Sequence, residues 1–131
     1  MLVHIGRSTG LHRCTVLEIM EYRTEGPEMI VMSGFGPNAD WLRNIEAKPD
    51  GFEVVIGSKR FAAADRVLED GEALEVITGY ERRNRFTAPI IRTVLSHLLG
   101  WRYDSSERAR RQLIAQLPLI AFRPRSLRPP T

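Results

Sequence analysis

The spacing of hydrophobic and polar positions changes near residue 70. Before that point, short runs rich in β-branched and aromatic residues alternate with turns that contain glycine or proline, which predicts strands. Residues 29–33 are almost continuously apolar, which predicts a strand buried on both faces. The predicted strands cover residues 2–5, 15–22, 29–33, 52–56 and 60–68, the last two joined as a hairpin.

Helical periodicity interrupts the strands once and then dominates from residue 71 to 117. Residues 39–48 place Trp41 and Ile45 on one face, with Asn38 as the expected N-cap. Apolar residues at helical spacing predict further helices to about Arg85, over residues 90–99 and up to Leu117. Asp104 and Glu107 have the spacing of a capping box for the last of these, and residues 119–122 predict a final strand.

Strands that come early and helices that come late are typical of an α+β fold with a mainly antiparallel sheet or barrel. We expect one domain over residues 1–123 and a disordered basic tail over residues 124–131. Residues 1–10 show no secretory signal, and a single cysteine, Cys14, allows no internal disulfide. These features predict a cytoplasmic protein in which Cys14 is an inert core thiol.

The charge of the chain depends on arginine. The formal net charge is +3, and Lys48 and Lys59 are the two lysines among 19 basic residues. Arginine favours bidentate recognition of phosphates and carboxylates, so an anionic ligand is expected. A net charge of +3 is too small to predict nucleic-acid binding, and none is expected.

Two segments have the composition of a ligand site. Residues 33–41 run from a buried strand through a glycine loop into a helix, where free amides favour an anion or an electron-rich ring edge. Residues 6–13 form a glycine turn with Arg7, Ser8, Thr9 and Arg13, which suits a phosphate or carboxylates. An ordinary strand-to-helix connection and an ordinary hairpin turn remain open for these segments.

Together these segments resemble the deazaflavin-dependent nitroreductase family. Residues 6–15 carry the pattern G-R-x-x-G-x-x-R-x-T, and residues 33–49 carry S-G-x-G-x-x-A-D-W-x-R-N-I-x-A-x-P. Residues 55–63, with V-x-x-G-x-x-R-F-x-A, are similar to the next hairpin of that family. The resemblance implies a split β-barrel similar to that of flavin-mononucleotide-binding oxidases, with peripheral helices, and coenzyme F-420 as the ligand.

The resemblance also implies roles for individual residues. Those matched to the coenzyme's anionic tail and its deazaflavin ring are Arg7, Ser8, Thr9, Arg13, Thr15, Ser33, Gly34, Trp41 and Asn44. Ser33 and Tyr80 are the candidate catalytic residues, Tyr80 as a proton donor, with Tyr103 as a second candidate donor. Both tyrosines also fit ordinary core or rim positions.

The implied activity is hydride transfer from the reduced coenzyme to an electron-poor small molecule of nitro, quinone or enone type. Two alternatives stay open: a carrier of coenzyme or of a fatty acyl ligand, favoured if the apolar stripe over residues 90–99 faces outward, and a reductase that binds flavin mononucleotide (FMN). A nucleic-acid binder that uses the arginine-rich helices and tail ranks below both and would show steeply salt-dependent affinity. The helical region from Asp70 to Leu117 is a candidate for shaping the substrate pocket or contacting a membrane, and a homodimer is also open. His4, His12 and His97 have no metal-ligand spacing, so no metal is expected.

Overall fold

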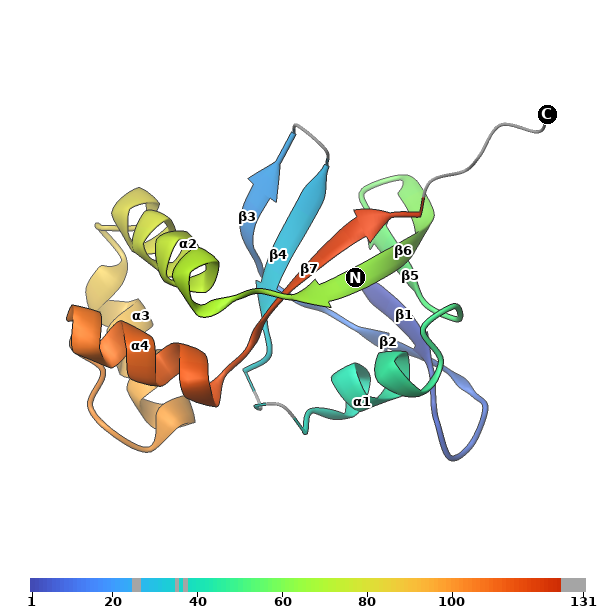
Figure 1. Ribbon diagram of the computed structural model, residues 1–131, viewed down its shortest axis with the longest axis horizontal. Helices are drawn as coiled ribbons and strands as arrows, with labels where there is room; N and C mark the ends of the chain where they lie inside the picture. Colours follow the sequence, from blue (N-terminus) through green and yellow to red (C-terminus); the bar gives the residue numbers. More distant parts are fainter. Residues whose placement is uncertain (25–26, 35, 37, 126–131) are drawn as a thin grey trace.

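A computed structural model describes residues 1–24, 27–34, 36 and 38–125. Within these residues seven strands and four helices follow the chain in the order shown in Figure 1. They are β1 (Leu2–Ile5), β2 (His12–Thr15), β3 (Ile19–Arg23), β4 (Glu28–Met32), α1 (Asp40–Ala47), β5 (Glu53–Ile56), β6 (Lys59–Val67), α2 (Asp70–Arg83), α3 (Ala88–Leu99), α4 (Glu107–Gln116) and β7 (Leu119–Pro124).

The strands form one antiparallel sheet in the order β2-β1-β5-β6-β7-β4-β3. The long strand β6 joins the two halves of this sheet. Its residues Lys59 to Ala62 pair with β5, and its residues Ala63 to Val67 pair with β7. The α+β class and the antiparallel pairing expected from the sequence are confirmed.

The sheet is strongly curled. Its two edge strands, β2 and β3, follow one another in the chain with three residues between them. Four residue steps span at most about 14 Å, whereas seven flat strands would separate the edges by about 29 Å. No pairing joins β2 to β3 in the described part of the chain, so the sheet is not closed there, and the split β-barrel expected from the sequence is not confirmed.

Two hydrophobic cores lie on opposite faces of the central strands. Helices α2, α3 and α4 gather at one end of the molecule, and α1 packs near β1 at the other (Figure 1). Along β7, Leu119 and Ala121 belong to the core of the helical end, while Ile120 and Phe122 belong to the core that holds Trp41. The prediction of a two-sided strand is confirmed in β4, where Ile30 lies in the first core and its neighbours in the second.

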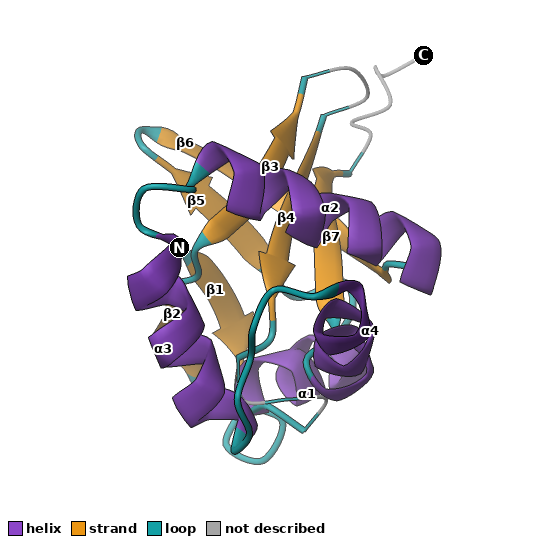
Figure 2. Cartoon of the chain, turned by 90° about the vertical axis from the view of Figure 1, so that its left-hand side faces the viewer, coloured by secondary structure: helices purple, strands orange, loops and turns teal. Residues whose placement is uncertain are grey.

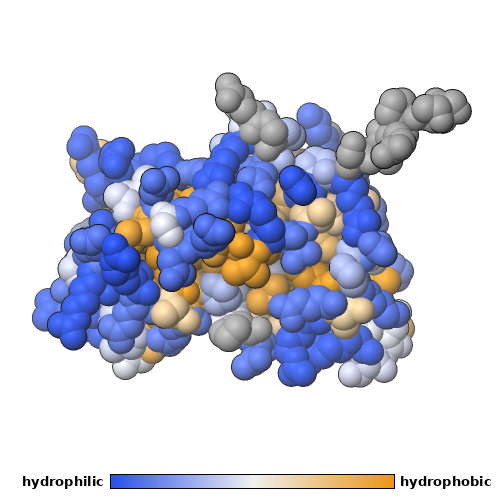
Figure 3. Space-filling view, in the orientation of Figure 1, coloured by the Kyte–Doolittle hydropathy of each residue, from blue (hydrophilic) through white to orange (hydrophobic). Residues whose placement is uncertain are grey.

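Helix α2 lies over the sheet (Figure 2) and is fixed to it by charge as well as by packing. Arg66 of β6 donates to both Glu28 of β4 and Glu72 of α2 at 2.7–2.9 Å. Arg23 of β3 donates to Glu72 at 2.7 Å. Hydrogen bonds from Arg66 and then Arg23 lower the pKa of Glu72 to about 2. In the view of Figure 3 hydrophilic residues cover most of the helical end, and apolar side chains show mainly between the helices and the sheet.

Several local predictions are wrong. The strand predicted over residues 15–22 is two strands, separated at residues 16–18. Ala39, not Asn38, is the N-cap of α1, and Ser106, not Asp104, caps α4 by accepting a hydrogen bond from the Ala109 amide.

The predicted tail begins too early. Strand β7 extends to Pro124, and the Arg125 amide donates to the Ala62 carbonyl at 2.9 Å. The rest of the predicted tail, residues 126–131, lies outside the described residues.

Candidate functional site

A chain of polar side chains runs beneath the first glycine turn. The Arg7 guanidinium donates to Asn44 Oδ1 at 2.7 Å, and the Arg7 backbone amide donates to the same oxygen at 3.1 Å. The Asn44 amide nitrogen lies 3.0 Å from His4 Nδ1, and His4 Nε2 lies 3.0 Å from the Thr15 hydroxyl. This chain ties the turn, α1, β1 and β2 to one another.

His4 and Asn44 are buried members of this chain, with 3% and 2% of their surface exposed. Asn44 therefore supports the site from below, with its amide engaged by Arg7 and His4. Burial, and then the charge of Arg13, lower the pKa of His4 below its ordinary value. A neutral His4 is thus favoured next to the two arginines of the turn.

The turn is tight and brings its polar groups close together. The Gly6 amide donates to the Leu11 carbonyl at 2.8 Å and the Gly10 amide to the Gly6 carbonyl at 2.8 Å. A Cβ at Gly6 would lie 2.6 Å from Thr9 Oγ1 and 3.1 Å from Arg13 Nε, so a side chain there would displace the groups that line the turn. Gly10 has φ of +71°, a conformation that glycine adopts without strain.

Two pockets join at this turn. One of about 220 Å³ holds the expected tail-binding residues, lined by Gly6, Arg7, Ser8, Thr9, Arg13, Asp40 and Asn44. The other, of about 540 Å³, is lined by His4, Arg13, Cys14, Thr15, Asn38, Ala39, Asp40 and Trp41. Arg13 and Asp40 line both, so the two pockets adjoin, and we call the pair the polar channel.

The positive charge of the two arginines in the channel is partly neutralised by Asp40. Asp40 pairs with Arg7 at 3.2 Å, whereas no ion pair involves Arg13 in the described part of the chain. Cys14 is exposed in this channel, so the prediction of a core thiol is wrong. On the edge strand β2 its side chain points away from the core.

In the second predicted segment, Ser33 is buried and hydrogen-bonded to neighbouring backbone. Ser33 is 0% exposed, its hydroxyl donates to the Gly36 carbonyl at 2.6 Å, and its amide donates to the Pro118 carbonyl at 2.9 Å. The Ser33 hydroxyl therefore holds the loop in place and faces no open pocket. Gly34 lies beside α3, since a Cβ there would be 3.8 Å from Leu98 Cδ1.

A third pocket, of about 320 Å³, lies between α2, α3 and the β3–β4 end of the sheet; we call it the apolar groove. Met20, Met32, Ile77, Tyr80, Ile90, Ile91, Val94, Leu95 and Leu98 form its apolar lining, with Glu18, Glu81, Asn84 and Thr87 at its polar positions. Gly34, at the start of the glycine loop, borders this groove at Leu98, and Asn38 and Ala39, at the end of the loop, line the polar channel.

Tyr80 is the candidate proton donor that reaches the apolar groove. Its hydroxyl donates to Glu18 Oε1 at 2.7 Å, and burial, then this hydrogen bond, raise the pKa of Tyr80 to about 12. Tyr103 is 2% exposed and its hydroxyl donates to Glu81, with its pKa raised by burial first. It does not line the groove.

The structure thus brings most of the predicted site residues together. Those on the polar channel or directly beneath it are Arg7, Ser8, Thr9, Arg13, Thr15, Trp41 and Asn44. Tyr80 lies apart from them, in the apolar groove. Sequence reasoning missed His4 and Asp40. The signal for His4 was available, because it alternates with the buried Leu2 and therefore faces inward from β1.

The fold and the site define an α+β domain with an arginine-lined polar channel next to an apolar groove. Residues 1–86 match the model of the family described as "F420H(2)-dependent quinone reductase". The chain belongs to this family. The name of the family implies coenzyme F-420, which supports an F-420-dependent oxidoreductase; the comparisons give no support to the FMN alternative.

A solved structure described as an "F420-H2 dependent reductase (FDR-A)" shares the fold, with a TM-score of 0.53 at 15% identity. The alignment covers 92% of this chain and 90% of that chain. A search of curated proteins finds no match. In residues 1–24, 27–34, 36 and 38–125 no helix is long and apolar enough to span a bilayer, and no cluster of three potential ligands could hold a metal ion.

Proposed function

We propose that this protein uses coenzyme F-420 to reduce an electron-poor, apolar small molecule, with quinones as the first class and nitro compounds and enones as the next. One observation carries the proposal: a channel lined by arginines and hydroxyls leads to a glycine loop, and an apolar groove begins at the other end of that loop. An anionic tail and an apolar acceptor would each find matching chemistry.

The residues of the turn fit the anionic part of the coenzyme. Arg7 and Arg13 supply guanidinium donors, and Ser8 and Thr9 supply hydroxyls, all on one exposed pocket. Arg7 is held in place by Asn44 and Asp40, while Arg13 is the more available of the two for a ligand. Trp41 would flank the ligand where the channel approaches the glycine loop.

When bound and reduced, the coenzyme supplies a hydride from its deazaflavin ring. The chain's own residues orient the acceptor and exclude water, because the groove lining is largely apolar. Tyr80 holds a proton on its hydroxyl at neutral pH, since its pKa is about 12. A hydride and a proton together convert a quinone into a hydroquinone, so Tyr80 is the proposed donor of that proton.

Binding of F-420 to the purified protein, followed by tryptophan quenching, tests the coenzyme assignment, with FMN as the parallel ligand. We expect saturable quenching by F-420, weakened at least tenfold in Arg13→Ala because a charge-assisted contact is worth about 1.5–3 kcal/mol. Arg123→Ala is the matched control, an exposed arginine on β7 away from the channel. Trp101→Phe leaves Trp41 as the reporter.

Turnover separates an enzyme from a carrier. Reduced F-420 mixed with protein and a soluble quinone should be oxidised, and Tyr80→Phe should slow this step while leaving coenzyme affinity unchanged, because Tyr80 lies outside the polar channel. Tight binding with no oxidation of the reduced coenzyme would favour the carrier. Tighter binding of FMN than of F-420 would contradict the coenzyme assignment.

A further inference from the structure

The hydrogen bonds beneath the glycine turn fix the orientation of the Asn44 amide. The Arg7 backbone N–H lies 3.1 Å and its guanidinium N–H 2.7 Å from one and the same side-chain atom of Asn44. Both of these groups of Arg7 are donors that cannot accept. The atom that faces them is therefore the amide oxygen, and the NH2 group of Asn44 points the other way, to His4 Nδ1 at 3.0 Å.

The orientation of Asn44 in turn fixes the tautomer of His4. Because Nδ1 receives a hydrogen bond from the Asn44 NH2 group, it carries no hydrogen of its own. A neutral ring then has its hydrogen on Nε2, which lies 3.0 Å from the Thr15 hydroxyl oxygen and donates to it. His4 and Asn44 are both buried, so these protein groups are the partners on which the tautomer depends.

This chain of hydrogen bonds ends in a donor at each pocket of the polar channel. The Thr15 oxygen accepts from His4, so the hydrogen of its hydroxyl needs a different acceptor. Within the described residues His4 is the one hydrogen-bond partner of that hydroxyl, and Thr15 lines the larger pocket. At the other end of the chain, Arg7 lines the smaller pocket and keeps N–H groups beyond those that bind Asn44 and Asp40.

We propose that His4 is a positioning residue of the channel: as the Nε2–H tautomer it holds Arg7 and Thr15 as two donors for one ligand. The ligand that matches them carries an anionic group at Arg7 and a second acceptor, a carbonyl or phosphate oxygen, at Thr15. His4 itself is 3% exposed and acts through its neighbours. That this ligand is F-420 rests on the proposed function, whereas the direction of the chain does not.

Protonation of His4 would disrupt this chain. A charged ring carries a hydrogen on both nitrogens, so Nδ1 would meet the NH2 group of Asn44 as a second donor. Turning the Asn44 amide would restore that contact but would place its NH2 group against both donors of Arg7. Either arrangement disturbs the contacts of Arg7, so Arg7 should respond when His4 takes up a proton.

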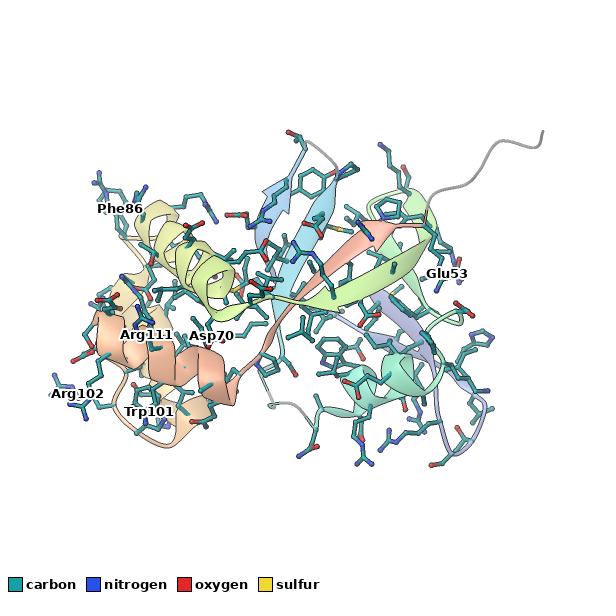
Figure 4. The ribbon with its side chains drawn as sticks, viewed as in Figure 1. Glu53, Asp70, Phe86, Trp101, Arg102 and Arg111 are labelled. Atoms are coloured by element: carbon teal, nitrogen blue, oxygen red, sulfur yellow. The ribbon has the colours of Figure 1, made fainter. Side chains whose placement is uncertain are left out.

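Arg13 and Asp40 are the charged groups that line a pocket together with His4. Arg13 lies opposite His4 in the pairing of β1 with β2, and Asp40 on α1 is paired with Arg7. Burial, and then the charge of Arg13, lower the pKa of His4 and so favour the neutral ring that the chain requires. Pairing with Val3 directs two further ionisable groups to the opposite face of the sheet, namely Cys14 and Glu53, the latter on the right-hand side of Figure 4.

Nuclear magnetic resonance of the isotope-labelled protein tests the chain without any ligand. At pH 7.5 the nitrogen shifts of the His4 ring should show a hydrogen on Nε2 and none on Nδ1. As the pH is lowered to 5, the Arg7 backbone amide should shift together with the His4 ring, and His4→Asn should abolish this shift because asparagine does not titrate. His12→Asn, at an exposed position on β2, should keep it. The opposite tautomer, or an Arg7 amide that does not follow His4, would overturn the proposal.

Affinity for F-420 tests the effect of the chain on the channel. Thr15→Val keeps the shape of the side chain but removes the donor, and it should weaken F-420 binding roughly fivefold. His4→Phe removes both hydrogen bonds of the ring and should weaken binding by about tenfold or more, because Arg7 and Thr15 both lose support. Two conservative variants should rescue: Thr15→Ser keeps a hydroxyl, and His4→Asn keeps an oxygen that accepts from Asn44, so each should bind more tightly than its partner variant.

His12→Phe is the matched control, since it makes the same change at an exposed histidine that lines neither pocket of the channel. It should bind F-420 as the unmodified chain does. Circular dichroism checks that each variant is folded, and if His4→Phe is not, Thr15→Val decides alone. Unchanged F-420 affinity in the folded variants would refute the positioning role and leave the coenzyme assignment standing.

Failure of the proposed function gives a different result. If the unmodified chain binds no F-420, the coenzyme assignment fails, while the tautomer of His4 still decides the direction of the chain. Inorganic pyrophosphate is then the probe of the channel, followed through the backbone amide shifts of Arg7 and Thr15. Weaker pyrophosphate binding by Thr15→Val than by Thr15→Ser would support the positioning role, and equal binding or none would refute it.

Discussion

Asn44 shows how much of the site depends on one buried side chain. Its carbonyl oxygen accepts from both the backbone and the guanidinium of Arg7, and its amide reaches His4. The pattern of residues 33–49 identified Asn44 as part of a site, but a sequence cannot tell a contact with ligand from a support beneath it. That distinction required knowing that the turn packs directly on α1, where Arg7 and His4 occupy the Asn44 amide.

His4 should make the stability of the protein depend on pH. Because burial lowers the pKa of His4 in the folded state below 6.5, the unfolded chain binds a proton that the folded chain resists. The stability that the protein gains from keeping His4 neutral is complete above pH 6.5 and is lost as the pH falls below that value. The free energy of unfolding should fall by up to about 1.4 kcal/mol per pH unit.

Urea unfolding of the unmodified chain and His4→Gln, at pH 7.5 and in steps down to pH 5, measures this effect. The variant should show a shallower pH dependence. His12→Gln, an exposed histidine on the neighbouring strand β2, is the control and should keep the original slope. Identical slopes in all three proteins would contradict the assignment to His4.

At the scale of elements, prediction from sequence worked where periodicity alone decides the structure. The apolar run of β4, the β5–β6 hairpin and the helix α1 follow from local patterns. The split of β2 from β3 could not be seen, because residues 11–23 contain no glycine or proline. The break at residues 16–18 arises from pairing: β2 joins β1 at one sheet edge and β3 joins β4 at the other.

Helix caps offer a test at this scale. Ser106 accepts from the Ala109 amide at 3.1 Å, whereas Thr87, the N-cap of α3, makes no side-chain cap hydrogen bond. Ser106→Ala should therefore lower the free energy of unfolding by about 1 kcal/mol. Thr87→Ala should lower it by a few tenths at most, and equal losses in a urea titration would argue against the cap at Ser106.

At the scale of the whole molecule, the two hydrophobic cores are separated by the same two strands. Strands β4 and β7 face both cores, so neither core can open without disturbing the other. Each core has its own tryptophan: Trp41 is buried in the core beneath the sheet, and Trp101 packs against the core of the helical end. The order of the strands could not be predicted from the sequence, because β7 pairs with strands far away along the chain.

Because β4 and β7 contribute to both cores, we expect the protein to unfold in a single transition. Fluorescence of Trp101→Phe reports the Trp41 core, and fluorescence of Trp41→Phe reports the helical end. Within each variant, the unfolding midpoint measured by fluorescence should coincide with the midpoint measured by circular dichroism. Comparing the two probes in the same protein removes any difference in stability between the variants. Separate transitions at the two tryptophans would show that the cores unfold independently.

The place of β7 in the sheet also bears on how the protein is made. It is translated after all the other described elements, yet it lies between β6 and β4 and completes the pairing of both. Until β7 emerges from the ribosome, two sheet fragments present unpaired inner edges, which are prone to pair with other chains. Nascent chains that stop before residue 119 should therefore depend on chaperones, and folding should finish only after β7 has been synthesised.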